Sequence, residues 1–174
     1  RTLSIGLADS SPIFFVLTNT RSMSAERAGE VTREVCRNLR SALRRLEMPW
    51  FVVSRSDSTL RGHYPVETDV ICEELGPFDA HFLIPAFFEG GRITRGGMHY
   101  VLTNDGPVPA HETQFARDAA FGYSTAYLPD YVEEKTGGRI PAAEVRQFTP
   151  EQDSREVLER LRHLCGNKCC VVNA

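Results

Sequence analysis

The residues best suited to chemistry lie in the segment Ser54–His63, which reads SRSDSTLRGH. It holds two fixed cations, Arg55 and Arg61, and the anion Asp57. Three hydroxyl side chains stand among them: Ser56, Ser58 and Thr59. A guanidinium group can hold a carboxylate through two parallel hydrogen bonds, and Asp and Ser exchange hydrogen bonds with polyols. These types fit a pocket for a small hydroxy acid or phosphate, and a polar turn with two solvated arginines is an equal alternative.

Further arginines follow other apolar segments. Arg21 comes after the apolar run Ile13–Leu17, and Arg92 lies in a glycine-rich turn after His81–Ile84. The carboxyl ends of parallel strands meet at one edge of a sheet, which is where ligands bind in open α/β folds. Three arginine-bearing strand ends therefore favour a pocket. Arg117 is a weaker candidate, because an exposed ion pair with a neighbouring acid is its simpler interpretation.

The spacing of apolar residues predicts the elements that would position these side chains. Periodicity predicts helices over about 25–47 and Val66–Leu75, with Ser24 as a cap. Continuous apolar runs predict buried strands, at Ile13–Leu17, Trp50–Val53 and His81–Ile84. We expect an α/β fold, mainly a parallel sheet in a three-layer sandwich with helices on both faces.

The second half of the chain predicts shorter elements. Residues 89–106 are rich in glycine around a short strand, His99–Leu102, and short helices are expected over Glu112–Ala119 and Pro129–Thr136. The α/β pattern then returns, with a strand at Val145–Phe148, a helix at Ser154–Cys165 and a strand at Cys169–Val172.

Composition excludes several classes of protein. The chain has 174 residues, enough for one domain, and a net charge of -3, which offers no basic field for nucleic acid. No apolar run approaches the ~20 residues that span a bilayer, and the start lacks a signal-peptide pattern. The five cysteines are unevenly spaced, so we expect free thiols, no metal site and a cytoplasmic location.

Several blocks in order resemble the four-carbon acid sugar kinase family, which was formerly a domain of unknown function. They are Asp57-Ser58-Thr59-Leu60-Arg61-Gly62, Pro85-Ala86-Phe87 with Glu89–Arg92 and Thr94, His99-Tyr100-Val101, and Thr113 with Phe115–Asp118. The resemblance runs from about Val16 to the last residue. It implies an α/β domain that binds a sugar acid such as threonate, erythronate or an oxo relative, and a second domain that binds ATP with Mg.

The resemblance also implies roles for individual residues. Those expected to bind substrate are Arg21, Arg55, Ser56, Asp57, Ser58 and Thr59. Arg61 would orient the substrate carboxylate or brace the loop, and Arg92 and Arg117 are further binding candidates. Asp57 is the candidate catalytic base within the chain, although we expect it to be a binder first.

The chain departs from the family pattern in two ways. Leu7–Ser10 does not match the Asp-Asp-x-Thr-Gly-Ala segment with which such proteins open, and Arg55 stands where relatives often carry Lys. We therefore expect residues 1–174 to be an incomplete N-terminal substrate-binding domain, inactive alone. Its ATP-binding partner domain and the nucleotide would then lie outside the chain, and so would the catalytic base if Asp57 is only a binder.

Two other functions compete with this interpretation. Some relatives are labelled type III effectors, so the domain could be an interaction module, which an exposed apolar patch without a polar pocket would favour. A scaffold without a ligand is the third possibility, but it leaves the arginine-bearing strand ends unexplained.

Overall fold

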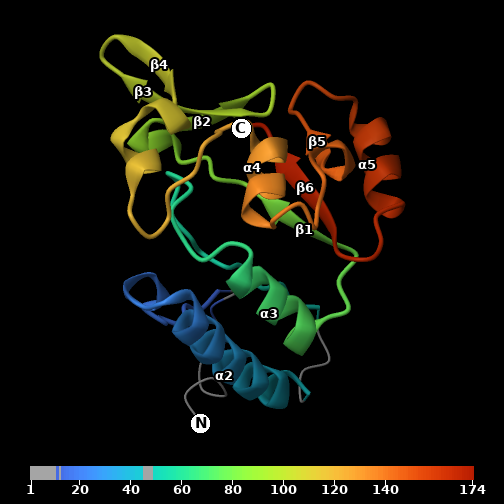
Figure 1. Ribbon diagram of the computed structural model, residues 1–174. Helices are drawn as coiled ribbons and strands as arrows, with labels where there is room; N and C mark the ends of the chain where they lie inside the picture. Colours follow the sequence, from blue (N-terminus) through green and yellow to red (C-terminus); the bar gives the residue numbers. More distant parts are fainter. Residues whose placement is uncertain (1–10, 12, 45–48) are drawn as a thin grey trace. The chain divides into compact units, whose positions relative to one another are not determined.

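The computed structural model describes residue 11, residues 13–44 and residues 49–174. The chain divides into two compact units. Unit 1 comprises Arg1–Arg55 and His63–Pro77, and unit 2 comprises Ser56–Gly62 and Phe78–Ala174. Figure 1 labels the elements of both units. Among the helices of the described ranges, none is long and apolar enough to cross a lipid bilayer.

Unit 1 is built on two helices, α2 (Ala25–Leu43) and α3 (Val66–Leu75), with a short 3-10 helix, η1 (Thr20–Ser22), before them. The Ser24 side chain accepts a hydrogen bond from the Arg27 backbone N–H and so caps α2 as predicted. Both predicted helices are confirmed, while residues 45–47 of the first prediction lie outside the described residues.

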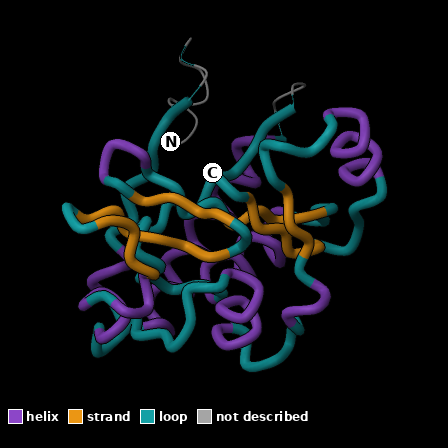
Figure 2. Tube along the Cα trace, turned by 90° about the horizontal axis from the view of Figure 1, so that it is seen from above, coloured by secondary structure: helices purple, strands orange, loops and turns teal. Residues whose placement is uncertain are grey.

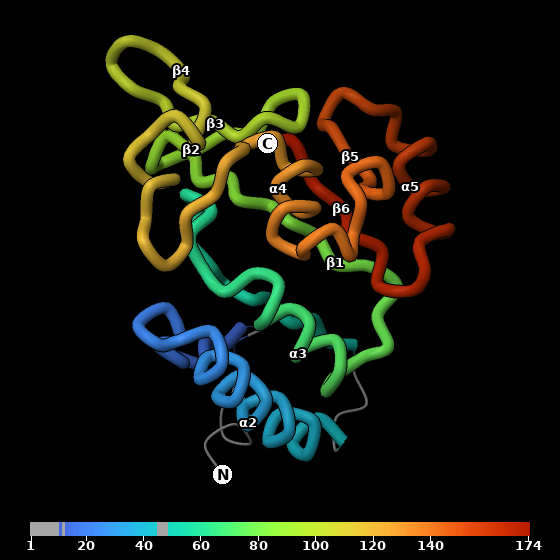
Figure 3. The backbone as a smooth tube through the Cα atoms, in the orientation of Figure 1, coloured from blue at the N-terminus to red at the C-terminus, as the bar shows by residue number. Residues whose placement is uncertain are grey.

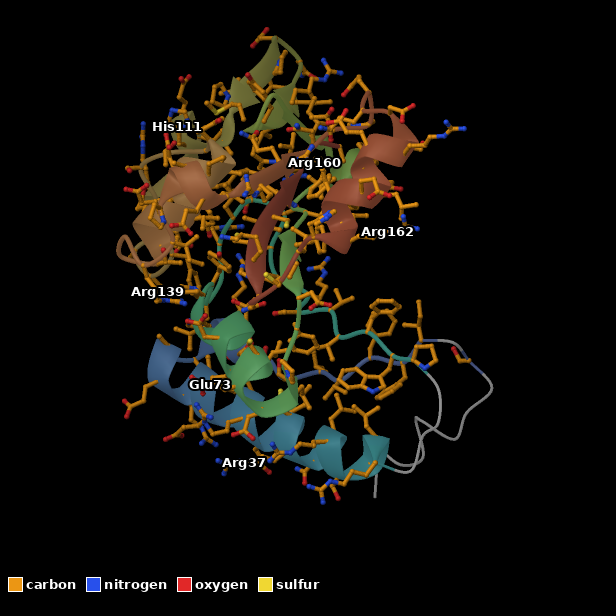
Figure 4. All side chains as sticks on the ribbon, turned by 90° about the vertical axis from the view of Figure 1, so that its right-hand side faces the viewer. Arg37, Glu73, His111, Arg139, Arg160 and Arg162 are labelled. Atoms are coloured by element: carbon orange, nitrogen blue, oxygen red, sulfur yellow. The ribbon has the colours of Figure 1, made fainter. Side chains whose placement is uncertain are left out.

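Ion pairs join α3 to α2. The Glu74 carboxylate accepts hydrogen bonds from Arg33 Nη1 and Arg37 Nε, each at 3.0 Å, and its side chain is only 8% exposed. Hydrogen bonding from Arg33 and Arg37 lowers the pKa of Glu74. Figure 4 labels Arg37 on α2 and Glu73, the neighbour of Glu74, on α3. The helix pair is thus held by charge as well as by apolar contact.

The two strands predicted in unit 1 are absent from the described residues. Residues 13–17 and 50–53 form irregular backbone, and large apolar side chains there are exposed, such as Leu17 at 94% and Phe51 at 93%. Residues 50–55 alternate between half-buried and exposed side chains, as an extended chain does when one face is packed. The prediction of buried strands was wrong here because an apolar run becomes a strand only where neighbours pair with its backbone.

The first sheet of unit 2 is parallel, in the order β1 (Ala80–Leu83), β6 (Lys168–Val172) and β5 (Arg146–Phe148). Helix α5 (Ser154–Arg162) connects β5 to β6, and the Arg160 guanidinium on α5 lies 4.5 Å from the centroid of the Phe148 ring. The α/β prediction is confirmed by this parallel sheet and by its β5–α5–β6 unit (Figure 1).

The second sheet of unit 2 is antiparallel, in the order β2 (Arg92–Arg95), β3 (Met98–Thr103) and β4 (Gly106–Pro109). Figure 2 shows the strands of unit 2 gathered in two groups. The sequence predicted only the central strand of this meander. The backbone N–H of Ala174 bonds to the Thr94 carbonyl at 3.0 Å, which places the last residue beside β2 (Figure 3).

Short helices connect the two sheets. They are η2 (Phe88–Gly90), η3 (Ala110–Glu112), η4 (Gln114–Arg117), α4 (Leu128–Lys135) and η5 (Ala142–Glu144). The helix predicted over Pro129–Thr136 is confirmed as α4, which buries Leu128 and Val132 completely. The helix predicted over Glu112–Ala119 is instead a pair of 3-10 turns. The cysteines are free thiols as predicted, and burial raises the pKa of Cys36 and of Cys170 to about 11.

Candidate functional site

The loop Ser56–Gly62, which belongs to unit 2, turns sharply after Asp57. The Leu60 N–H bonds to the Asp57 carbonyl at 3.0 Å, and Leu60 takes a left-handed φ of 63°. A branched side chain rarely adopts this conformation, so the surrounding contacts must hold the turn. Gly62 ends the loop against Ser56, and a Cβ at this position would clash with the Ser56 hydroxyl.

Three side chains of the loop form a closed hydrogen-bonded ring. Asp57 Oδ1 accepts from the Thr59 N–H and from the Thr59 hydroxyl, each at 2.9 Å. Arg61 Nε donates to the same hydroxyl at 2.9 Å, and Arg61 Nη2 donates to Asp57 Oδ2 at 3.0 Å. Thr59 is 2% exposed, so its hydroxyl lies inside the ring. The ring fixes a guanidinium and a carboxylate side by side.

Phe115 and Asp118, from a later part of the chain, extend this ring. Sequence reasoning did not select either of them as a site residue. The Phe115 ring centroid lies 4.9 Å from the Arg61 guanidinium carbon, and Asp118 Oδ2 lies 3.7 Å from Arg61 Nη1. The Asp118 carboxylate also accepts from the backbone N–H groups of Ala120 and Phe121, which orients it. Both residues stand in the block Phe115–Asp118. The one sequence feature that could have pointed to Asp118 is its place next to Arg117.

Arg92, at the start of β2, shares the aromatic contact. Its guanidinium carbon lies 5.8 Å from the Phe115 ring centroid, and its Nη1 donates to the Gly90 carbonyl. Within the described part of the chain, Arg92 Nε is a buried nitrogen without a hydrogen-bond partner. The structure therefore brings two predicted arginines, Arg61 and Arg92, to one aromatic ring.

The remaining predicted residues are placed differently. Ser56 is exposed and donates to the Arg61 carbonyl at 3.4 Å, Ser58 is half-buried, and Arg117 is exposed at the end of η4. Arg21 and Arg55 are exposed residues of unit 1. The segment bearing Arg21 is fastened within that unit, because the Thr20 hydroxyl donates to Glu67 at 2.7 Å and the Thr20 carbonyl lies 3.0 Å from His63 Nε2.

Three buried aromatic side chains bond to the backbone of the loop. His99 Nε2 lies 2.7 Å from the Ser58 carbonyl, the Tyr123 hydroxyl donates to the Thr59 carbonyl at 2.9 Å, and the Tyr131 hydroxyl donates to the Leu60 carbonyl at 3.0 Å. Burial lowers the pKa of His99, with a smaller contribution from the charge of Arg92. Burial also raises the pKa of Tyr123 to about 12, so both side chains are neutral near pH 7.

One groove of the described surface is lined by none of the predicted residues. An open groove of about 630 Å³ runs between α2 and α3 of unit 1, lined by residues such as Gly29, Arg33 and Val66. In the described ranges, no three His, Cys, Asp or Glu side chains group closely enough to hold a metal ion.

The fold and this loop together define an α/β domain with a charged, hydroxyl-bearing loop. The chain belongs to the family of sugar-binding N-terminal domains, which matches residues 1–174. It is similar to a D-erythronate kinase of Heliobacterium modesticaldum, with 32% identity over 138 residues, and spans 29% of the length of that relative.

Solved structures agree with this placement. A domain of unknown function from Bordetella bronchiseptica, a domain-swapped dimer with bound citrate, has a TM-score of 0.66 and 26% identity, covering 98% of this chain and 39% of that one. A Haemophilus influenzae protein has a TM-score of 0.63 and 20% identity, covering 89% of this chain and 36% of that one, and supports the fold alone.

Proposed function

We propose that this chain is the sugar-acid-binding part of an ATP-dependent kinase that acts on four-carbon sugar acids of the erythronate and threonate type. The observation that carries the proposal is the ring of Asp57, Thr59 and Arg61 with Arg92 on the adjoining aromatic face. The family and the D-erythronate kinase relative support a sugar acid as ligand. The citrate bound in the Bordetella structure supports a hydroxy acid.

Arg92 and Arg61 are proposed to receive the ligand carboxylate. A guanidinium group whose Nε is buried without a partner gains more from a carboxylate than a solvated one does, because its desolvation has already occurred. Ser56 and Ser58 are proposed to bond the ligand hydroxyls, with Arg117 as a further binding residue of unit 2. Arg21 and Arg55 are proposed as binding residues from the sequence alone. Thr59 is proposed to act through Asp57 and Arg61, since its hydroxyl is buried between them.

Asp57 is proposed as a binder and organiser of the loop before it is a base. Both of its carboxylate oxygens already accept hydrogen bonds from Thr59 or Arg61. A base must reach the acceptor hydroxyl within hydrogen-bond distance, so this carboxylate would have to exchange one of these bonds. An Asp57→Asn variant separates the roles, because a lost rate with intact binding identifies the base and lost binding identifies the binder.

ATP and Mg are proposed to be held by a further domain of the longer protein. The described residues group no acidic set that fits Mg, and the sequence contains no glycine–lysine loop that would cradle phosphates. The chain supplies binding and orientation of the acceptor, which together with charge stabilisation carry most of a phosphoryl transfer. We expect no sugar-acid-dependent ATP turnover by residues 1–174 alone.

Calorimetric titration of the chain tests this function. D-erythronate and D-threonate are expected to bind, while erythritol, which lacks the carboxylate, is expected to release no heat. Arg92→Gln should weaken D-erythronate binding at least about tenfold, as the loss of one charged hydrogen bond does. Arg95→Gln, on an exposed residue of the same strand, is the matched control and should bind like the unaltered chain. Equal binding of erythritol and D-erythronate would contradict the proposal.

An interaction module remains the second candidate, and one observation favours it. Large apolar side chains of unit 1 are exposed at Phe15, Leu17, Phe51 and Val53. Exposed side chains of this kind are typical of protein contact surfaces. They also suit contact with other parts of a longer protein, of which this chain would be about a third. Phe51→Ser removes one of these exposed apolar side chains. If the variant binds D-erythronate normally, sugar-acid binding does not depend on this side chain, and the two functions are separated.

A further inference from the structure

The loop Asp57–Arg61 is held at three consecutive carbonyl groups. Those of Ser58, Thr59 and Leu60 each lie within 3.0 Å of a side-chain donor: His99 Nε2, the Tyr123 hydroxyl and the Tyr131 hydroxyl respectively. The three donors come from strand β3, from the segment before α4 and from α4 itself. Each interior carbonyl of this short polar turn is bonded to a separate buried side chain. The turn is therefore fixed by residues outside the loop.

The direction of each bond is determined by chemistry. A carbonyl oxygen can only accept, so His99 must carry its proton on Nε2 and donate to Ser58. Its Nδ1 then accepts from the Thr94 hydroxyl, 3.0 Å away and also buried. The two tyrosine hydroxyls likewise donate, and that of Tyr123 is shared with the Ala110 carbonyl at 3.3 Å.

These donors are buried and mutually packed. His99 is 0% exposed, Tyr131 is 2% exposed and Tyr123 is 7% exposed. The rings of Tyr123 and Tyr131 meet edge to face, with centroids 5.7 Å apart. Because the rings cannot shift without opening a cavity, the positions of their hydroxyls are set by the core of unit 2.

We propose that His99, Tyr123 and Tyr131 are positioning residues, which hold the backbone of the Asp57–Arg61 loop so that the Asp57 and Arg61 side chains face the ligand in fixed geometry. We call the three hydrogen bonds from His99, Tyr123 and Tyr131 to the loop carbonyls the brace. The left-handed backbone φ of Leu60 explains why the loop needs it. An Asp57–Leu60 turn with a branched residue at positive φ relaxes toward ordinary conformations unless its carbonyls are held. The proposal rests on the proposed function for its ligand, but the geometry of the loop can be measured without one.

The test replaces each tyrosine by phenylalanine, which removes one hydroxyl and keeps the ring. Tyr127→Phe is the matched control, because the Tyr127 hydroxyl accepts from Gln147 at 3.0 Å and touches no loop carbonyl. Hydrogen exchange measured by NMR at the Leu60 amide is compared with exchange at Val171, a buried residue of β6, so that a change in overall stability cancels. D-erythronate affinity is measured on the same samples.

We expect Tyr123→Phe and Tyr131→Phe to raise the Leu60 exchange rate relative to Val171 by about three- to tenfold, and Tyr127→Phe to leave it unchanged. D-erythronate affinity should fall by a similar factor in the first two variants only. Unchanged relative exchange at Leu60 in both would overturn the proposal. If the unaltered chain binds no D-erythronate but Tyr123→Phe and Tyr131→Phe still raise the relative exchange rate at Leu60, the brace stands and the proposed function fails. If binding weakens without loosening, the tyrosines act in another way and the brace is refuted.

Discussion

Replacing Thr59 by valine would break the ring while keeping the shape of a buried, β-branched side chain. The change removes the hydroxyl that donates to Asp57 Oδ1 and accepts from Arg61 Nε, each at 2.9 Å. Hydrogen bonds to charged groups contribute roughly 1.5–3 kcal/mol each. The Arg61 side chain is 23% exposed and water can replace part of its bond. The expected loss in the free energy of unfolding is therefore about 2–4 kcal/mol.

Urea denaturation followed by circular dichroism measures this loss. Thr136→Val is the matched control, since the Thr136 hydroxyl also donates and accepts, but to the neutral partners Val132 and Ile140. We expect this control to lose about 1 kcal/mol. If Thr59→Val costs no more than Thr136→Val, the charged ring contributes no special stability and the reasoning about the loop is refuted.

Three further predictions concern pH and burial. The unfolded chain takes up a proton near pH 6.5 that buried, neutral His99 does not, so the free energy of unfolding should fall as pH drops below about 6.5. In His99→Gln, urea midpoints measured at several pH values should no longer fall as pH drops below about 6.5. An unchanged dependence of the midpoint on pH would contradict this prediction. Glu74 has a lowered pKa, so its contribution to the free energy of unfolding is present above about pH 4.5 and is lost as pH falls further. When helicity is followed during acid titration, it should therefore change less with pH in Glu74→Gln than in the unaltered chain. Exposed Phe51→Ala should cost under about 0.5 kcal/mol in urea denaturation, against about 2–5 kcal/mol for buried Leu75→Ala in the same unit, and equal costs would contradict the exposure of Phe51.

The sequence predicted the helices well because their signals are local. Ser24 caps α2, and apolar residues three and four apart specify its buried face. Strand formation at Ile13–Leu17 could not be decided in this way, because it depends on pairing with residues distant in the chain. Strands β2 and β4 of the meander were missed for a related reason, since both are short and lie in a glycine-rich segment.

The candidate site was predicted where it is contiguous. Asp57, Thr59 and Arg61 lie within one hexapeptide, so residue types alone selected them, with a polar turn as an equal alternative. Phe115 and Asp118 reach Arg61 only through the fold, and no local pattern distinguishes Asp118 from a solvated acid. His99 reaches the Ser58 carbonyl only because of where β3 lies, which no local pattern shows.

Chemical-shift mapping of D-erythronate binding tests the central claim most directly. Two-dimensional NMR of the 174-residue chain is recorded during titration, including the Arg side-chain Nε–H signals. We predict saturable shifts at the backbone of Asp57–Arg61 and at the Nε–H groups of Arg61 and Arg92. Shifts confined to the groove between α2 and α3, or saturable binding that leaves the Asp57–Arg61 loop unmoved, would contradict a sugar-acid site at this loop.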